Sequence, residues 1–131
     1  MISTRGRYAL RVMIDLASQA PGEYIPMKEV AARQGISLKY LEQILPTLSQ
    51  NNYVKTISGK GGGYMLAKQP SEITAGDILR LTEKELAPVA CLSEGAEHCD
   101  RESICPTIDF WKGYNKVILD YLDSKTLADF L

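Results

Sequence analysis

The chain has 131 residues, of which 45% are hydrophobic, so it is long enough for one compact core but short for two independent domains. Its net charge of −1 combines two unlike parts: nine Lys or Arg against four Asp or Glu give residues 1–68 a net of +5, and six against twelve give residues 69–131 a net of −6. No apolar run approaches the length of a membrane span or of a signal-peptide core, so we expect a cytoplasmic protein without membrane contact, whose basic half can bind phosphate groups.

The first predicted helix begins near Thr4 and ends before Pro21. One of its faces carries small or apolar residues at helical spacing: Tyr8, Ala9, Val12, Met13, Leu16 and Ala17. A shorter helix follows, with Pro26 as its first residue and Gly35 in the left-handed conformation just past its end.

A third helix is predicted to begin after Ser37, which is a suitable N-cap. Its apolar stripe consists of Leu38, Leu41, Leu45 and Leu48. Two short helices joined by a glycine turn form a helix-turn-helix, whose second helix can enter the major groove of DNA. Pro46 removes a backbone donor at a cost of about 3 kcal/mol, so we expect a kink or an early end there, beyond the exposed part that would read DNA, Ser37–Gln43.

A β-hairpin is predicted next, with strands at Tyr53–Ser58 and Tyr64–Ala67. The connecting run Gly59–Gly63 contains four glycines and Lys60, which suits a hairpin tip whose backbone approaches a phosphate or a minor groove closely. A nucleotide-binding P-loop would need Gly-Lys-Ser/Thr at the start of a helix, and this run is followed by Tyr64 and Met65 instead. The pattern therefore predicts that the hairpin is a wing beside the helix-turn-helix.

Thr74 and Asp77 stand at the spacing of a capping box and begin a fourth helix, which we expect to support the wing. A loop from Pro88 to Pro106 follows, and Pro106 is expected to start a long amphipathic helix. The apolar stripe of that helix comprises Phe110, Tyr114, Val117, Ile118, Tyr121 and Leu122. A domain this small cannot cover the stripe together with its own core, which favours a symmetric homodimer over the alternative of an intramolecular core helix. Thr126 caps a last short turn, and Trp111 is interpreted as an interface or core anchor.

Three cysteines, Cys91, Cys99 and Cys105, fall within the loop between Pro88 and Pro106. An odd number of thiols does not make a disulfide framework, whereas three thiolates in one loop can hold a metal or an iron-sulfur cluster. The fourth ligand would come from an external thiol or from one of His98, Asp100, Glu94, Glu97, Glu102 and Asp109. A Cys₃His zinc site and three unligated thiols remain the alternatives.

Four motifs, in this order and at this spacing, resemble the Rrf2-type winged-helix regulators, and the likeness continues through Thr126–Asp129. They are Ser3-Thr4-Arg5-Gly6-Arg7-Tyr8-Ala9-Leu10-Arg11, Ile36-Ser37-Leu38-Lys39-Tyr40-Leu41-Glu42-Gln43, Gly61-Gly62-Gly63-Tyr64 and Ile73-Thr74-Ala75-Gly76-Asp77-Ile78. The resemblance is strongest to the family members that carry an iron-sulfur cluster. It implies a homodimer that binds a two-fold-symmetric double-stranded DNA operator, with the third helix in the major groove and the wing at the minor groove.

Carried over by position, the resemblance implies DNA contacts from the third helix and the wing: Ser37, Lys39, Tyr40, Glu42, Gln43, Ser58, Lys60 and Gly61. Glu42 could accept a hydrogen bond from cytosine and Gln43 could pair with adenine, whereas Ser37 and Tyr40 are better placed for phosphates. Ser58 stands where the cluster-binding regulators have an arginine, which leaves Lys60 as the cation of the wing.

The resemblance also implies that Cys91, Cys99 and Cys105 bind an iron-sulfur cluster of the 2Fe-2S type, which can be absent from purified protein. Two departures concern the fourth ligand: Ile108 stands where the cluster-binding regulators supply a histidine, and Arg7 stands where a nitric-oxide-sensing relative supplies an aspartate.

The sequence therefore predicts a mostly α-helical winged helix-turn-helix with a small β-hairpin and a long dimerisation helix. The expected parts are a DNA-binding domain at 1–85, a cysteine loop at 86–106 and the dimerisation helix with a C-terminal turn at 107–131. The function expected is a repressor or dual transcription regulator that senses iron-sulfur or redox status. The alternatives are a regulator of cysteine metabolism controlled by a partner protein without a cluster, and an interaction module that does not bind DNA. No enzymatic activity is expected, since no catalytic constellation surrounds the single histidine.

Overall fold

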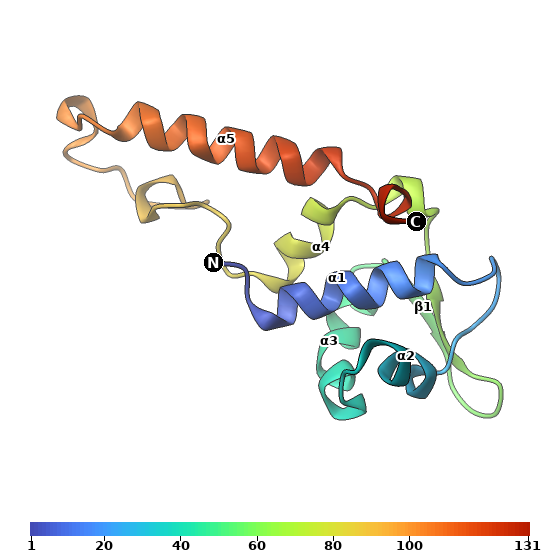
Figure 1. Cartoon of the computed structure of the whole chain (residues 1–131). Coiled ribbons are helices and arrows are strands. Elements are labelled where there is room, and N and C mark those ends of the chain that lie inside the picture. The colour runs from blue at the N-terminus through green and yellow to red at the C-terminus, as the bar shows by residue number, and fades with distance from the viewer.

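The computed structural model describes residues 1–131 and has five α-helices and one two-stranded sheet (Figure 1). The elements are α1 (Thr4–Ala17), α2 (Met27–Gln34), α3 (Leu38–Gln50), β1 (Val54–Ile57), β2 (Gly63–Leu66), α4 (Ala75–Thr82) and α5 (Ile108–Ser124). Four short 3₁₀ turns complete the chain: η1 (Pro70–Glu72), η2 (Ala90–Leu92), η3 (Glu102–Ile104) and η4 (Leu127–Phe130). The predicted fold class is confirmed, and no helix has both the length and the apolar content that crossing a membrane requires.

The core lies between α1, α2, α3, the hairpin and α4. Many of its side chains come from the predicted apolar faces of α1 and α3, and others, such as Ile25, Ile36, Ile44 and Ile73, lie outside those predicted faces. The core consists of Ala9, Val12, Met13, Leu16, Ile25, Met27, Val30, Ile36, Leu41, Ile44, Leu45, Leu48, Val54, Ile73, Ile78 and Leu127. The predicted start of α2 at Pro26 is wrong by one residue, because Pro26 is the extended N-cap. Gly35 ends that helix in the left-handed conformation, with φ of 64°, which a residue with a Cβ adopts at a cost.

Helix α3 does not end early at Pro46, contrary to one of the two outcomes expected from the sequence, and continues to Gln50. The reason is its packing: Leu45 and Leu48 are buried on either side of the proline, while Pro46 itself is exposed. The burial of these leucines offsets the lost backbone hydrogen bond.

Strands β1 and β2 pair antiparallel, with Val54 opposite Leu66 and Ile57 opposite Gly63. The loop between α1 and α2 pairs with the other edge of β2, where Ile25 and Tyr64 exchange backbone hydrogen bonds of 2.8 and 2.9 Å. This bridge joins the tip-side half of β2 to the residue that precedes Pro26 and α2, and the turn of residues 58–62 extends beyond it.

Helix α4 begins with the predicted capping box: the Asp77 backbone N–H donates to the Thr74 hydroxyl, and the Thr74 N–H donates to the Asp77 carboxylate. Its main neighbours are α1 and α5, so it braces helices more than the wing that it was expected to support. The C-terminal turn returns to the start of α4. There Ala75 donates to the carbonyl of Lys125, and Leu127, fully buried, donates to that of Ile73.

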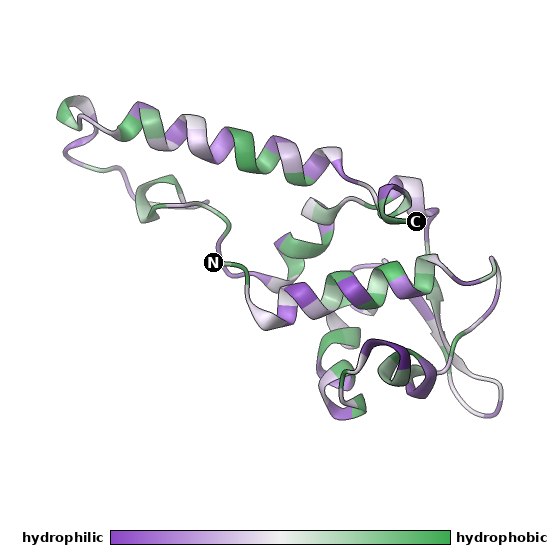
Figure 2. Cartoon of the chain, viewed as in Figure 1, coloured by the Kyte–Doolittle hydropathy of each residue, from purple (hydrophilic) through white to green (hydrophobic).

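Helix α5 begins at Ile108, two residues after the predicted start at Pro106, and none of its residues is buried. Figure 1 shows it along the side of the molecule opposite α2, α3 and the hairpin tip. Figure 2 shows apolar residues recurring along its length between polar ones. The helix is therefore amphipathic as predicted: Ile118 and Leu122 of its apolar stripe are partly covered by the chain, whereas Phe110, Tyr114, Val117 and Tyr121 are exposed.

One buried charge links α1 to α2. Asp15 is the buried acid of the core, 5% exposed, and it accepts bidentate hydrogen bonds from Arg33, the shortest of 2.7 Å, and one of 2.8 Å from Gln34. Burial alone would raise the pKa of Asp15, but the hydrogen bonds from Arg33 and Gln34 and the charge of Arg33 together hold it below its ordinary value.

We predict that Asp15→Asn lowers the free energy of unfolding by about 1–3 kcal/mol at neutral pH, because the amide loses the charge-assisted bonds. A depressed folded-state pKa stabilises the fold above the unfolded pKa of about 3.9, and that stability disappears as the pH falls through the folded value. The gap between wild type and variant should therefore close below about pH 4 in urea titrations. Glu29→Gln is the matched control, since Glu29 lies 3.7 Å from Arg33 on the exposed surface. A gap that persists at low pH would contradict this assignment.

Candidate DNA-binding surface and cysteine loop

Helix α3 presents a polar face because its apolar face is buried. Leu41, Ile44, Leu45 and Leu48 lie in the core, and three of the predicted contact residues, Lys39, Glu42 and Gln43, lie exposed on the other side of the helix. Ser37 is the N-cap, as predicted, and its hydroxyl accepts a 3.1 Å hydrogen bond from the Tyr40 backbone N–H. The sequence thus positions a row of exposed polar side chains at the N-terminal half of α3.

Tyr40 differs from the other predicted contact residues because it is half-buried. Its ring packs edge-to-face on that of Tyr8 in α1, with the centroids 5.4 Å apart. The Arg11 guanidinium lies 5.3 Å from the Tyr8 ring centroid and donates to the side chain of Gln34 in α2. This series of contacts joins α1, α2 and α3, and the ring of Tyr40 packs α3 onto α1.

The tip of the wing carries the remaining predicted contacts, Ser58, Lys60 and Gly61, and all three are exposed. A 3.0 Å hydrogen bond from the Gly62 N–H to the Gly59 carbonyl closes the turn. Figure 1 shows this tip on the same side of the molecule as α2 and α3. Both predicted DNA-contacting segments can therefore face one duplex.

The sequence indicates the positive charge of the arginines of α1 but not their contacts. In the structure Arg5 donates a 2.9 Å hydrogen bond to the Thr47 hydroxyl, which places a cation beside the C-terminal half of α3. The buried ion pair of Asp15 was not predicted either, although an acid on the apolar face of a predicted helix is a signal for such a pair. At the start of α1, the Ser3 backbone N–H and hydroxyl both donate to Glu83, just past the end of α4, and no sequence pattern links these two residues.

The cysteine loop is a series of turns between α4 and α5, with η2 and η3 inside it. Cys91 is exposed, Cys99 and Cys105 are half-buried, and all three are free thiols. Cys91 and Cys99 line one cavity of about 310 Å³, and Cys105 lines a different, neighbouring one. The loop brings two of the three thiols to a shared cavity and leaves the third apart.

The polar neighbours of the thiols are themselves engaged. His98, considered as a ligand from the sequence, is largely exposed, and its Nδ1 lies 3.4 Å from the Glu102 carboxylate, which also accepts from Lys112 at 3.2 Å. Cys105 Sγ lies 3.6 Å from the Thr107 hydroxyl. That contact and the Thr107 backbone N–H hold the pKa of the Cys105 thiol below its ordinary value.

The three soft thiols suit an iron-sulfur cluster chemically, but their arrangement does not fit one as it stands. The chain has no group of three or more His, Cys, Asp or Glu side chains close enough to hold a metal ion. The predicted donor set is thus present in one loop without forming a preassembled site.

The family model "Rrf2: Iron-dependent Transcriptional regulator" matches residues 2–131. Among curated proteins, the HTH-type transcriptional regulators IscR of Serratia proteamaculans and of Yersinia pseudotuberculosis are 34% identical to the chain over 128 residues, covering 98% of the chain and 77% of each relative.

Two solved structures are similar over 99% of the chain. CymR, the global cysteine regulator of B. subtilis, has a TM-score of 0.80 and 38% identity, with 95% of that protein covered. IscR of T. potens has a TM-score of 0.77 and 35% identity, with 85% covered. A cysteine regulator and an IscR protein are thus similar to this chain to nearly the same degree.

We predict that Gln43→Ala relaxes base preference at one position per half-site, costing about 1–3 kcal/mol there, because an exposed amide on α3 can pair with a base edge. Lys60→Ala at the wing should instead weaken binding to all sequences alike and reduce the salt dependence, as expected for a phosphate contact. Selection from random duplex DNA, followed by titration at several salt concentrations, separates the two roles. A Gln43 variant that selects the same bases as wild type would refute its role.

Proposed function

Because the chain belongs to the Rrf2 family of transcriptional regulators, we propose that it binds a two-fold-symmetric operator as a homodimer, with α3 in the major groove and the wing at the minor groove. The observation that carries the proposal is the placement of the exposed face of α3 and the glycine-rich wing on one side of the molecule, within the half of the chain whose net charge is +5. A basic surface of this kind neutralises phosphates, and the duplex supplies them at regular spacing.

Within this proposal the side chains divide into two roles. Glu42 and Gln43 read base edges, because they are exposed on α3 and carry the acceptor and amide groups that match cytosine and adenine. Lys39, Ser37 and the hydroxyl of Tyr40 hold phosphates near the helix N-terminus, where backbone N–H groups also favour anions. At the wing, Lys60 is the cation and Ser58 and Gly61 allow the backbone to come close.

The homodimer is proposed from the surface of α5. Phe110, Tyr114, Val117 and Tyr121 are 64, 48, 67 and 61% exposed and recur at helical spacing, so they form one continuous apolar stripe. A stripe of this length on a monomer marks an interaction surface, and a second copy of α5 covers it symmetrically. An apolar cavity of about 670 Å³ beside the stripe, lined by Met1, Ile2 and Trp111 among others, extends the same surface. In this division residues 1–85 bind DNA, and α5 joins the protomers.

The signal is proposed to act at the loop of residues 86–106. Detection of iron-sulfur or redox status by Cys91, Cys99 and Cys105 is supported by the soft donors and by the similarity to IscR proteins. Because the thiols are not gathered, ligand binding there requires the loop to rearrange. The similarity to CymR supports the second candidate, regulation of cysteine metabolism through a partner protein without a cluster.

We predict that Val117→Glu converts the dimer to a monomer and weakens binding to paired half-sites at least tenfold, because a charge replaces the middle of the apolar stripe and two half-sites must be held together. The side chain is exposed within one chain, so the fold should be unaffected. Lys116→Gln changes the net charge equally on the polar side of α5 and should stay dimeric. Light scattering measures the mass, and a dimeric Val117→Glu variant would overturn the proposed interface. Deletion of the region from Pro106 onward is a poorer test, because it also removes Leu127 from the core.

Anaerobic reconstitution with iron and sulfide tests the cluster. If the three thiols ligate a cluster, wild type takes up iron and sulfide, develops visible absorbance and changes its operator affinity, while the triple Cys→Ser variant does none of these. Equal uptake by both proteins, or identical operator binding with and without iron, would reject cluster sensing and leave regulation through a partner protein as the candidate.

A further inference from the structure

A bidentate ion pair between Arg80 and Asp123 joins α5 to the proposed DNA-binding domain. Neither the sequence patterns nor the family resemblance predicts it. We infer that the pair Arg80–Asp123 sets the angle at which α5 leaves the domain, and thereby determines which spacing between two half-sites the dimer accepts. The inference rests on the proposed function, because it concerns a dimer joined through α5.

The geometry of the pair is specific. Arg80 lies in the last turn of α4 and Asp123 at the end of α5, and the two guanidinium nitrogens Nη1 and Nη2 donate to the two carboxylate oxygens at 2.6 and 2.8 Å. A bidentate pair fixes direction as well as distance, since both groups are planar. The hydrogen bonds and charge of Arg80 hold the pKa of Asp123 below its ordinary value, so the pair is charged at neutral pH.

Gly76 makes room for the pair. A Cβ built at this residue would lie 2.1 Å from Oδ1 of Asp123 and 2.9 Å from Nη1 of Arg80, both closer than atoms can approach. The glycine lies in the first turn of α4, where its φ is ordinary and alanine would favour the helix more. The sequence thus keeps a poor helix former at the place where the ion pair needs space.

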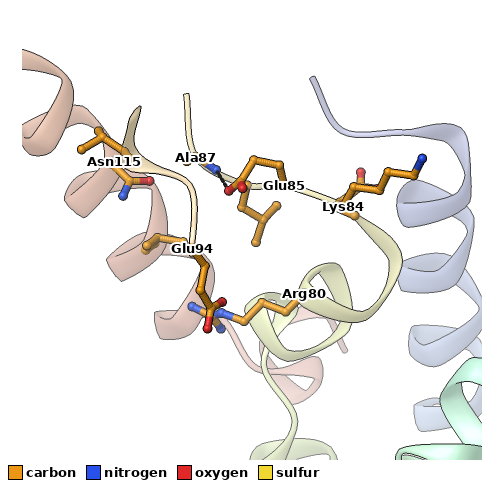
Figure 3. A pocket seen from close by; sticks show the side chains of 10 residues that line it. Arg80, Lys84, Glu85, Ala87, Glu94 and Asn115 are labelled. Carbon is orange, nitrogen blue, oxygen red and sulfur yellow. Dashed lines mark hydrogen bonds between the residues drawn. The ribbon is translucent and has the colours of Figure 1, made fainter. Parts of the chain in front are cut away.

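Besides the ion pair, this junction contains the packing of α4 against α5 and two backbone hydrogen bonds of the chain that follows α5. The hydrogen bonds from Ala75 to Lys125 and from Leu127 to Ile73 anchor the residues that follow Ser124. Along α5 itself no residue is buried. A cavity of about 430 Å³ lies between the middle of α5 and the loop that follows α4, and Figure 3 shows Arg80 and Asn115 of α5 on opposite sides of it. The middle of α5 therefore has open space beside it, and the bidentate pair near its C-terminal end adds a directional restraint to the packing of α4 on α5.

The length of α5 determines how far a small rotation at its C-terminal end displaces its other end. A helix of 17 residues is about 25 Å long, so a rotation of about 10° at one end displaces the other by about 4 Å, which is close to one base-pair step. Both side chains are partly exposed, 44 and 45%, and such pairs add at most about 1 kcal/mol to stability. The pair consequently contributes more to geometry than to the free energy of unfolding.

The test compares spacing preference with half-site preference. Selection from random-sequence duplex DNA with wild type gives the paired half-sites, and duplexes with the same half-sites and spacers longer or shorter by one or two base pairs are then titrated. Asp123→Asn removes the charge, and Gly76→Ala displaces the pair while keeping both charges. Asp120→Asn is the matched control, because Asp120 pairs with Lys116 within α5.

We expect both variants to remain dimeric and to select the same half-site bases, while their preference for the selected spacer over its neighbours falls by about fivefold, equivalent to about 1 kcal/mol. The control should keep the wild-type ratio. Wild-type ratios in Asp123→Asn or in Gly76→Ala overturn the inference and leave the proposed function intact. A monomeric wild type, or one that selects single half-sites, overturns the proposed function and the inference with it.

Discussion

The packing of α2 against α1 depends on one buried carboxylate. Asp15 lies in a core that is otherwise apolar, and its charge is tolerated because Arg33 and Gln34 of α2 bond to it from the surface side. Those bonds fix α2 on α1, while the ring of Tyr40 fixes α3 on Tyr8. The polar face of α3 is therefore held by contacts made on its opposite side, and its exposed residues are free to meet a ligand.

Helix α5 contributes little to the core. The core consists of residues from the first 85 positions and Leu127, whereas no residue of α5 is fully buried and its stripe of exposed apolar side chains is typical of an interaction surface. Helix α5 packs against α4, and beside Gly76 the ion pair of Arg80 and Asp123 joins the two helices. The cysteine loop connects the other end of α5 to α4, so a change in the loop acts on a helix that is fixed at one end.

Local chemistry was predictable from the sequence, and distant pairing was not. Ser37, Gly35 and the Thr74–Asp77 box act within a few residues of themselves, and the structure has each in its predicted role. Pro46 was misjudged because its local cost is outweighed by leucines that pack on other elements. Arg80 and Asp123 are 43 residues apart and follow no pattern. For the cysteines, closeness along the chain predicted one shared site. The fold of the loop instead separates Cys105 from the cavity that Cys91 and Cys99 line.

The burial of Leu127 has a consequence for the order of events during synthesis. This side chain fills the core beside Ile73, which is made 54 residues earlier, with the whole loop and α5 in between. On the ribosome this core cannot be completed until α5 has been translated, and contacts between residues far apart in the sequence slow folding. The last side chain of the core is therefore supplied by a residue that follows α5, so a chain cut short anywhere within α5 lacks a complete core.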